Sequence, residues 1–112
     1  MITLIFPPEW LNEHSNVWDY CPEVHEIVTE EVAARQIAAF SSWEVPDTDL
    51  REIAAKTLIL TGTRDVIIPP GHSRRLACLI PGSEFQEIPG AGHGLMYQEP
   101  DRFSQIILDF LA

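Results

Sequence analysis

The sequence predicts an α/β fold in which two or three parallel strands are flanked by helices. Two short strand-like runs, at residues 57–62 and 84–89, are each followed by a glycine-containing loop, as buried strands often are. A helix-length segment at about residues 71–80 separates them, so the order is strand, helix, strand. Because such crossovers are right-handed and join parallel strands, both loops should reach the same edge of the sheet.

Each of these loops carries one side chain suited to acid–base chemistry. Asp65 follows the first strand and His93 follows the second, at the strand ends where open α/β sheets place their chemistry. A carboxylate that accepts from one imidazole nitrogen fixes the tautomer, and the other nitrogen can then take a proton from a hydroxyl. Asp65 and His93 are therefore the candidate catalytic residues. On spacing alone, a purely structural Asp–His hydrogen bond is the commoner alternative.

Together these segments resemble the C-terminal portion of an α/β-hydrolase, the superfamily of serine esterases, lipases and related enzymes. The matching residues are 58–65 with 68–69, the Ile-Pro-Gly turn at 80–82, the Ile-Pro-Gly-Ala-Gly-His run at 88–93, and 99–100 followed by Phe103, Phe110 and Leu111. In that family the chain order of the triad is serine, acid, histidine. The resemblance implies that Asp65 and His93 are the second and third members. It also implies a small-molecule substrate with an ester, amide or other acyl or carbon–carbon bond.

The first member of such a triad is absent from the 112 residues. The nucleophile should precede Asp65 inside G-x-S-x-G, but all six glycines lie at or after the first strand. The nearest partial match, Gly71-His72-Ser73, lacks the second glycine, and we expect Ser73 to be a helix-start residue. The sequence thus predicts a hydrolase-like chain that is inactive alone. The alternative is a non-catalytic, self-associating interaction module in which Asp65 and His93 only brace two loops.

Residues 1–55 are predicted to form a helical cap-like segment, and residues 56–112 a C-terminal hydrolase half that folds as one globular unit. Residues 2–6 could be a short third strand or the entry to a helix near Pro8. Apolar residues recur at helical spacing from Cys21 to Trp43, namely Val24, Ile27, Val28, Val32, Ile37, Ala38 and Phe40. This pattern favours one amphipathic helix or two, and residues 33–40 resemble the last helix of a hydrolase cap.

Three further features complete the predicted fold. Trp10, Trp18 and Trp43 are expected to pack in the core, with a substrate pocket as the alternative. Residues 47–53 have the pattern of a short capped helix that leads into the first strand. After Glu99-Pro100, an apolar stripe of Phe103, Ile106, Ile107, Phe110 and Leu111 predicts a terminal helix packed on the sheet.

Composition narrows the class of protein and its surroundings. The net charge of −10, with only seven Lys and Arg, argues against nucleic acid and anionic membrane surfaces as partners. Cys21 and Cys78 are expected to be small buried or half-buried residues of a reducing compartment, with a disulfide left open. No signal-like or membrane-length run occurs, so a cytoplasmic protein is expected. Metal-ligand spacings and phosphate-binding glycine loops are absent, so no cofactor or metal is expected.

The predicted sheet also indicates a partner. Two strands alone are marginally stable, and the strand at residues 57–62 is apolar on both faces. Its unpaired edge therefore needs a cover. We expect a homodimer that buries residues 1–45 and this strand, or else a complementary N-terminal hydrolase half.

Overall fold

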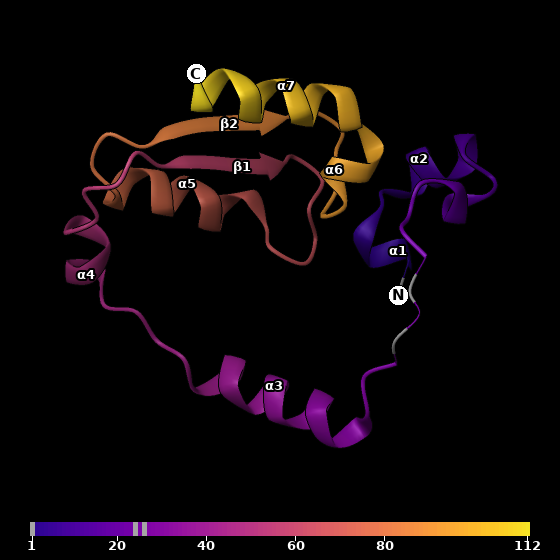
Figure 1. Cartoon of the computed structure of the whole chain (residues 1–112), viewed down its shortest axis with the longest axis horizontal. Helices are drawn as coiled ribbons and strands as arrows, with labels where there is room; N and C mark the ends of the chain where they lie inside the picture. The colour runs from indigo at the N-terminus through magenta and orange to yellow at the C-terminus, as the bar shows by residue number, and fades with distance from the viewer. Residues whose placement is uncertain (1, 24, 26) are drawn as a thin grey trace.

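The computed structural model describes residues 2–23, 25 and 27–112, and among them it contains a parallel sheet of two strands (Figure 1). Strand β1 (Leu58–Gly62) pairs with β2 (Glu84–Ile88), from Leu58 beside Glu84 to Gly62 beside Ile88. Helix α5 (Pro70–Leu79) connects the strands and packs on one face of the sheet. The predicted α/β fold with a parallel strand–helix–strand unit is confirmed.

Helix α7 (Pro100–Leu111) covers the opposite face, as the sequence predicts. Its side chains Phe103 and Ile106 pack against a buried cluster of Ile88, Ala91 and Leu95. Leu95 begins the short helix α6 (Leu95–Gln98), which joins the second strand's loop to α7. Pro100 stands in the first turn of α7, where its missing N–H costs no hydrogen bond.

The N-terminal residues form helices, so the third strand considered at residues 2–6 is not present. Helix α1 (Ile2–Ile5) is followed by α2 (Pro8–Glu13) and a 3₁₀ turn, η1 (Val17–Asp19). The physical reason is a competing contact. The Ile5 carbonyl accepts from the Gly94 N–H at 2.9 Å, and Phe6 is only 1% exposed. These residues are therefore anchored on the loop that carries His93.

The predicted helix from Cys21 to Trp43 is shorter than expected. Helix α3 (Glu30–Ser42) begins after Thr29, whose hydroxyl caps the Val32 N–H at 3.3 Å. Ile27 and Val28 precede this cap in non-helical, exposed backbone. Their β-branched side chains lower helix propensity, which helps to explain the late start. Val24 and Glu26, like Met1, lie outside the described residues.

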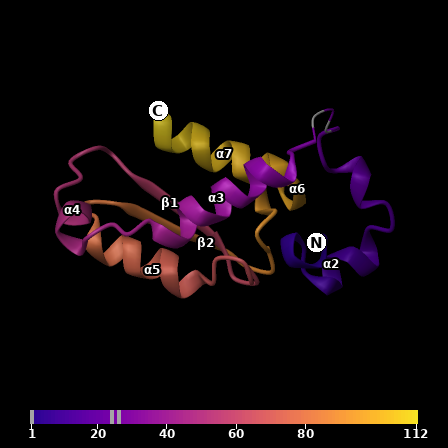
Figure 2. The same ribbon diagram turned by 90° about the horizontal axis from the view of Figure 1, so that it is seen from below.

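The apolar side chains of α3 are exposed, although their helical spacing suggested that they pack in a core. Figure 1 shows α3 standing apart from the other elements, on the β1 side of the sheet. In Figure 2, which is turned by 90°, α3 overlaps the two strands in the view. Ile37 and Phe40 are 66% and 78% exposed. The radius of gyration, 16.2 Å, exceeds the roughly 13 Å expected of a compact chain of this length.

Smaller expectations had mixed outcomes. The short helix α4 (Asp47–Arg51) is present, but Pro46 precedes it and no side chain caps it.

Trp18 and Trp43 are exposed, so the prediction that they pack in the core is wrong for both within this chain. Cys21 and Cys78 are free thiols, and Cys78 is exposed, contrary to expectation. Over the residues described, no helix is long and apolar enough to cross a membrane.

Trp10 lies in a cluster of aromatic side chains. It is half-buried and stacks on Phe6 at 4.7 Å and on His14 at 4.0 Å between ring centroids. Tyr20 meets the Trp10 ring edge-on at 5.1 Å. This aromatic cluster stiffens the N-terminal segment that contacts the His93 loop.

Candidate active site

Asp65 is held by the turn that follows β1. Its Oδ1 accepts from the backbone N–H groups of Ile67 and Ile68 at 2.9 and 2.8 Å. The carboxylate is only 8% exposed. These two donors fix the side chain in one orientation and leave its second oxygen, Oδ2, directed at the next loop.

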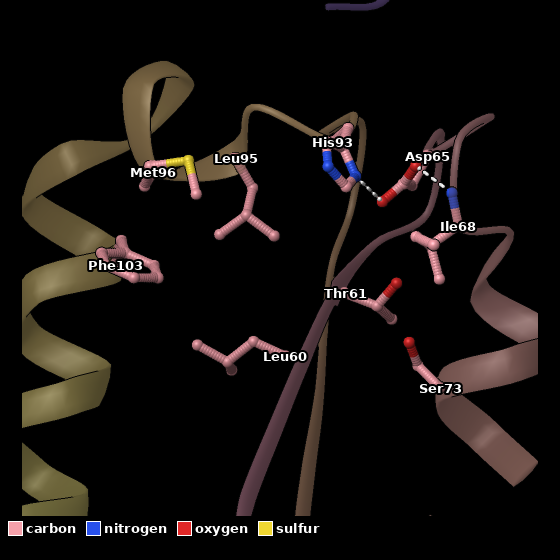
Figure 3. Close-up of a pocket in the computed structure, with 9 residues that line it drawn as sticks. All are labelled: Leu60, Thr61, Asp65, Ile68, Ser73, His93, Leu95, Met96 and Phe103. Atoms are coloured by element: carbon pink, nitrogen blue, oxygen red, sulfur yellow. Dashed lines mark hydrogen bonds and ion pairs between the residues drawn. The ribbon is translucent and has the colours of Figure 1, made fainter. Parts of the chain in front are cut away.

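His93 stands on the loop after β2, and its Nδ1 lies 3.0 Å from Asp65 Oδ2 (Figure 3). The imidazole side chain is 43% exposed. An ionised carboxylate can only accept, so this contact requires a proton on Nδ1, and in the neutral ring the other nitrogen, Nε2, is then an acceptor. The sequence prediction that these two residues lie side by side is confirmed by the geometry of the structure.

Backbone contacts join the two loops directly. The Arg64 N–H donates to the Ala91 carbonyl at 2.8 Å, and the Gly90 N–H donates to Thr63 Oγ1 at 2.9 Å. Gly90 has a φ of 78°, in the left-handed region that favours glycine. The Asp65 and His93 loops are therefore one connected unit.

Two further contacts support the histidine loop from outside it. Gln98 Oε1 accepts from the Gly92 N–H at 2.7 Å, and Ile5 supplies the carbonyl that meets Gly94. Sequence reasoning missed the role of Ile5, because nothing in a short apolar run indicates a distant carbonyl contact.

A cavity of about 290 Å³ lies at the Asp65–His93 pair and is lined by nine residues. They are Leu60, Thr61, Asp65, Ile68, Ser73, His93, Leu95, Met96 and Phe103. Figure 3 shows that the cavity has two different walls. Leu60, Leu95, Met96 and Phe103 form an apolar wall, and Thr61 and Ser73 bring hydroxyls from β1 and α5. Sequence reasoning also missed Leu95 and Met96, although their position just after His93 was a usable signal.

Ser73 lines the cavity but is not placed as a nucleophile. It lies in the first turn of α5, as predicted, and is 7% exposed. The only hydrogen-bond partner of the His93 ring within the described residues is Asp65. The arrangement can therefore orient an imidazole as a general base, and no hydroxyl of these residues is positioned to receive its help.

The remaining histidines do not assemble a second centre. His14 stacks on Trp10, His25 lies 3.7 Å from Glu23, and His72 is exposed in the first turn of α5. Among the described residues, no group of three or more His, Cys, Asp or Glu side chains could hold a metal ion.

Comparison with known proteins identifies relatives along almost the whole chain. A putative carbamate hydrolase, RutD, of Caulobacter segnis is 27% identical over 111 residues, which cover 96% of this chain and 40% of the relative. A 2-hydroxy-6-oxo-6-phenylhexa-2,4-dienoate hydrolase of Burkholderia cepacia is 33% identical over 81 residues, covering 72% of this chain and 28% of the relative.

A solved structure matches the arrangement as well as the sequence. A thermophilic esterase from Thermogutta terrifontis superposes with a TM-score of 0.78 at 27% identity, covering 99% of this chain and 41% of the esterase. The chain thus spans about two fifths of the length of the curated carbamate hydrolase that it matches. The model of the alpha/beta hydrolase family matches residues 2–106, and the chain belongs to that family.

Proposed function

We propose that Asp65 and His93 are the acid and the general base of a Ser-Asp-His triad that hydrolyses an ester or related acyl bond of a small molecule. The nucleophile is supplied by a part of a hydrolase outside these 112 residues. The observation that carries the proposal is the 3.0 Å contact between His93 Nδ1 and Asp65 Oδ2, with Asp65 Oδ1 separately held by two N–H groups. Such a pair fixes one tautomer of the imidazole.

The chemistry follows from the free ring nitrogen. His93 Nε2 takes the proton of a serine hydroxyl as the oxygen attacks the acyl carbon, and later returns it to the leaving group. Asp65 stays ionised and stabilises the imidazolium formed in between. Donors for the oxyanion must also come from outside these residues, and they usually supply the larger part of the rate enhancement.

For this reason the 112 residues alone should show no enzymatic turnover. We expect hydrolysis of a nitrophenyl ester at no more than the rate of free imidazole. Saturable turnover that both His93→Ala and Ser73→Ala abolish would contradict this expectation and make Ser73 the nucleophile.

The competing function is a non-catalytic interaction module derived from a hydrolase. Its support is the exposed apolar face of α3, where Ile37 and Phe40 are largely open to solvent. In that case the Asp65–His93 hydrogen bond only connects two loops, and its loss would change stability without changing any chemistry.

A chimera separates the two functions. Residues 2–112 would replace the matching 41% of the Thermogutta terrifontis esterase, which keeps its own preceding segment. If the proposal is right, the chimera hydrolyses a nitrophenyl ester. Asp65→Asn or His93→Ala in the chimera then lowers kcat by about 10³-fold or more. The control is His72→Ala, which removes an exposed imidazole of α5 and should leave kcat unchanged.

Two results would contradict the catalytic proposal. One is a chimera whose activity survives His93→Ala. The other is a chimera with cooperative unfolding and no hydrolysis, which would favour the interaction module. Circular dichroism melting of every variant distinguishes a lost function from a lost fold.

A further inference from the structure

The residues on both sides of His93 are hydrogen-bonded to one residue, Gln98. The Gly92 N–H, just before His93, donates to Gln98 Oε1 at 2.7 Å. The Gly94 carbonyl, just after His93, accepts from the Gln98 backbone N–H at 3.1 Å. The side chain and the backbone of Gln98 therefore bracket His93, and the two bonds close the chain between residues 92 and 98 into a ring.

The bond to Gly92 is a buried one. A backbone N–H can only donate, so the atom of the Gln98 amide that meets it is the carbonyl oxygen. Gly92 is buried, and a Cβ on it would lie 2.7 Å from the Ile5 carbonyl oxygen and 2.8 Å from Pro7 Cδ. The N-terminal segment thus packs closely on Gly92. Without Gln98 this N–H would lose its acceptor, and a buried donor without a partner is costly.

Helix α6 gives Gln98 a fixed place beside the loop. The helix begins at Leu95, two residues after His93, and ends at Gln98. Leu95 belongs to the buried cluster on which Phe103 and Ile106 of α7 pack. The Gln98 side chain is therefore carried by a helix that is anchored in the core, and the bracket ties the backbone around His93 to that core.

An uncharged acceptor suits this position. Gln98 also lines a second cavity, of about 350 Å³, on the other side of the loop from the Asp65 contact. The carboxylates on the lining of this cavity are those of Glu9, Glu13 and Glu99. A carboxylate in place of the Gln98 amide would add a further negative charge beside them, and like charges repel. The amide accepts from Gly92 without that charge.

We propose that Gln98 is a positioning residue, which holds the backbone of His93 where Nδ1 can meet Asp65 Oδ2. The inference rests on the proposed function, in which His93 is the general base, and Gln98 acts on that base without touching the substrate. The imidazole is 43% exposed, so its surroundings leave it room to turn, and the 3.0 Å contact depends on where the backbone places it (Figure 3). A misplacement of about 1 Å can cost about 10²-fold in rate.

The test removes the acceptor of Gln98 and measures the tautomer of His93. Gln98→Met has a side chain of similar length with no carbonyl oxygen. The 112-residue chain is labelled with ¹⁵N histidine and held at a pH where the imidazole is neutral. The variant should lower the ratio of the Nδ1–H to the Nε2–H tautomer about fivefold, the change that one net hydrogen bond produces. Gln98→Glu keeps an acceptor oxygen and should retain the wild-type ratio.

Two further variants separate positioning from a general loss of stability. Gln105→Met makes the same exchange at an exposed position of α7 and should change neither the ratio nor the melting temperature. Thr63→Val removes the acceptor of the Gly90 N–H, in the same loop. It should lower the melting temperature and leave the ratio near the wild-type value, because both neighbours of His93 keep their bonds to Gln98.

Gln98→Asn serves if Gln98→Met fails to fold. It stays polar, but its shorter side chain withdraws the oxygen from Gly92, so the ratio should fall in the same direction. A wild-type ratio in either folded variant would overturn the positioning role and leave the proposed function standing. An equal fall in Thr63→Val would also overturn it, since any loosening of the loop would then have this effect. A wild type without a preference for Nδ1–H would contradict the proposed function together with this inference.

Discussion

Replacing Gly62 by alanine should damage the fold at the point where the two site loops meet. A Cβ at Gly62 would lie 2.2 Å from the Ala91 carbonyl oxygen and 2.6 Å from the Gly92 carbonyl oxygen. Both are backbone atoms, so no flexible side chain can move aside. Ordinary contacts at a Cβ begin at 3.4 Å, so β1 and the His93 loop would have to separate by more than an ångström.

The expected cost follows from that displacement. Overpacking a well-packed site costs roughly 1–3 kcal/mol, occasionally more, and a clash with rigid backbone belongs at the upper end. We therefore expect Gly62→Ala to lower the free energy of unfolding by about 3 kcal/mol. The separation would also break the hydrogen bond between the Arg64 N–H and the Ala91 carbonyl. Urea denaturation followed by tryptophan fluorescence measures the change.

Gly71→Ala is the matched control for this substitution. No atom lies within 4 Å of a Cβ at Gly71, which stands in helix α5. Alanine there should stabilise the chain by up to about 1 kcal/mol, because it lowers the entropy of the unfolded state. A Gly62→Ala protein as stable as the wild type would refute the packing of the two loops, whereas failure to fold would agree with it.

Three further predictions concern the supports of the site. Asp65→Ala should lower the free energy of unfolding by about 1–3 kcal/mol, because it leaves two backbone N–H groups without their acceptor. Asp65→Asn keeps an acceptor and should cost less. Equal losses of the two variants in urea denaturation would show that these two hydrogen bonds do not hold the turn. Phe6→Ala should cost about 3 kcal/mol and shift tryptophan fluorescence, whereas Leu4→Ala, at a 53% exposed position, should cost under about 0.5 kcal/mol. Arg64→Ala breaks an exposed ion pair with Glu9 and should change stability by less than about 1 kcal/mol, so a larger loss in thermal melting would show that the pair is not merely a surface contact.

The strand–helix–strand unit was predictable because its local signals agree with its tertiary contacts. β1 has the apolar run of a buried strand, α5 begins at Pro70, and Gly82 and Gly90 provide the positive φ values that the turns require. The resemblance of the loops to a hydrolase then placed Asp65 and His93. Their contact followed from topology alone, since parallel strands bring their carboxyl ends to one edge.

The N-terminal third was harder to predict because its structure depends on distant partners. Residues 2–5 have strand-like side chains, but the Gly94 N–H captures the Ile5 carbonyl and Phe6 packs near Gly94. Apolar periodicity extended the α3 helix too far, since period alone does not mark the Thr29 cap. The same periodicity suggested that the apolar side chains of α3 pack in a core. Whether they are buried depends on a second surface that packs against them, and within the described chain the apolar face of α3 is exposed.

The tautomer of His93 tests the central claim most directly. In a protein labelled with ¹⁵N histidine and held at a pH where the imidazole is neutral, nuclear magnetic resonance should show a proton on Nδ1 and none on Nε2. Asp65→Asn, which removes the charge but keeps an acceptor for the turn, should abolish this preference. A proton on Nε2, or rapid averaging between both nitrogens in the wild type, would mean that Asp65 does not orient His93 and that the pair is no general base.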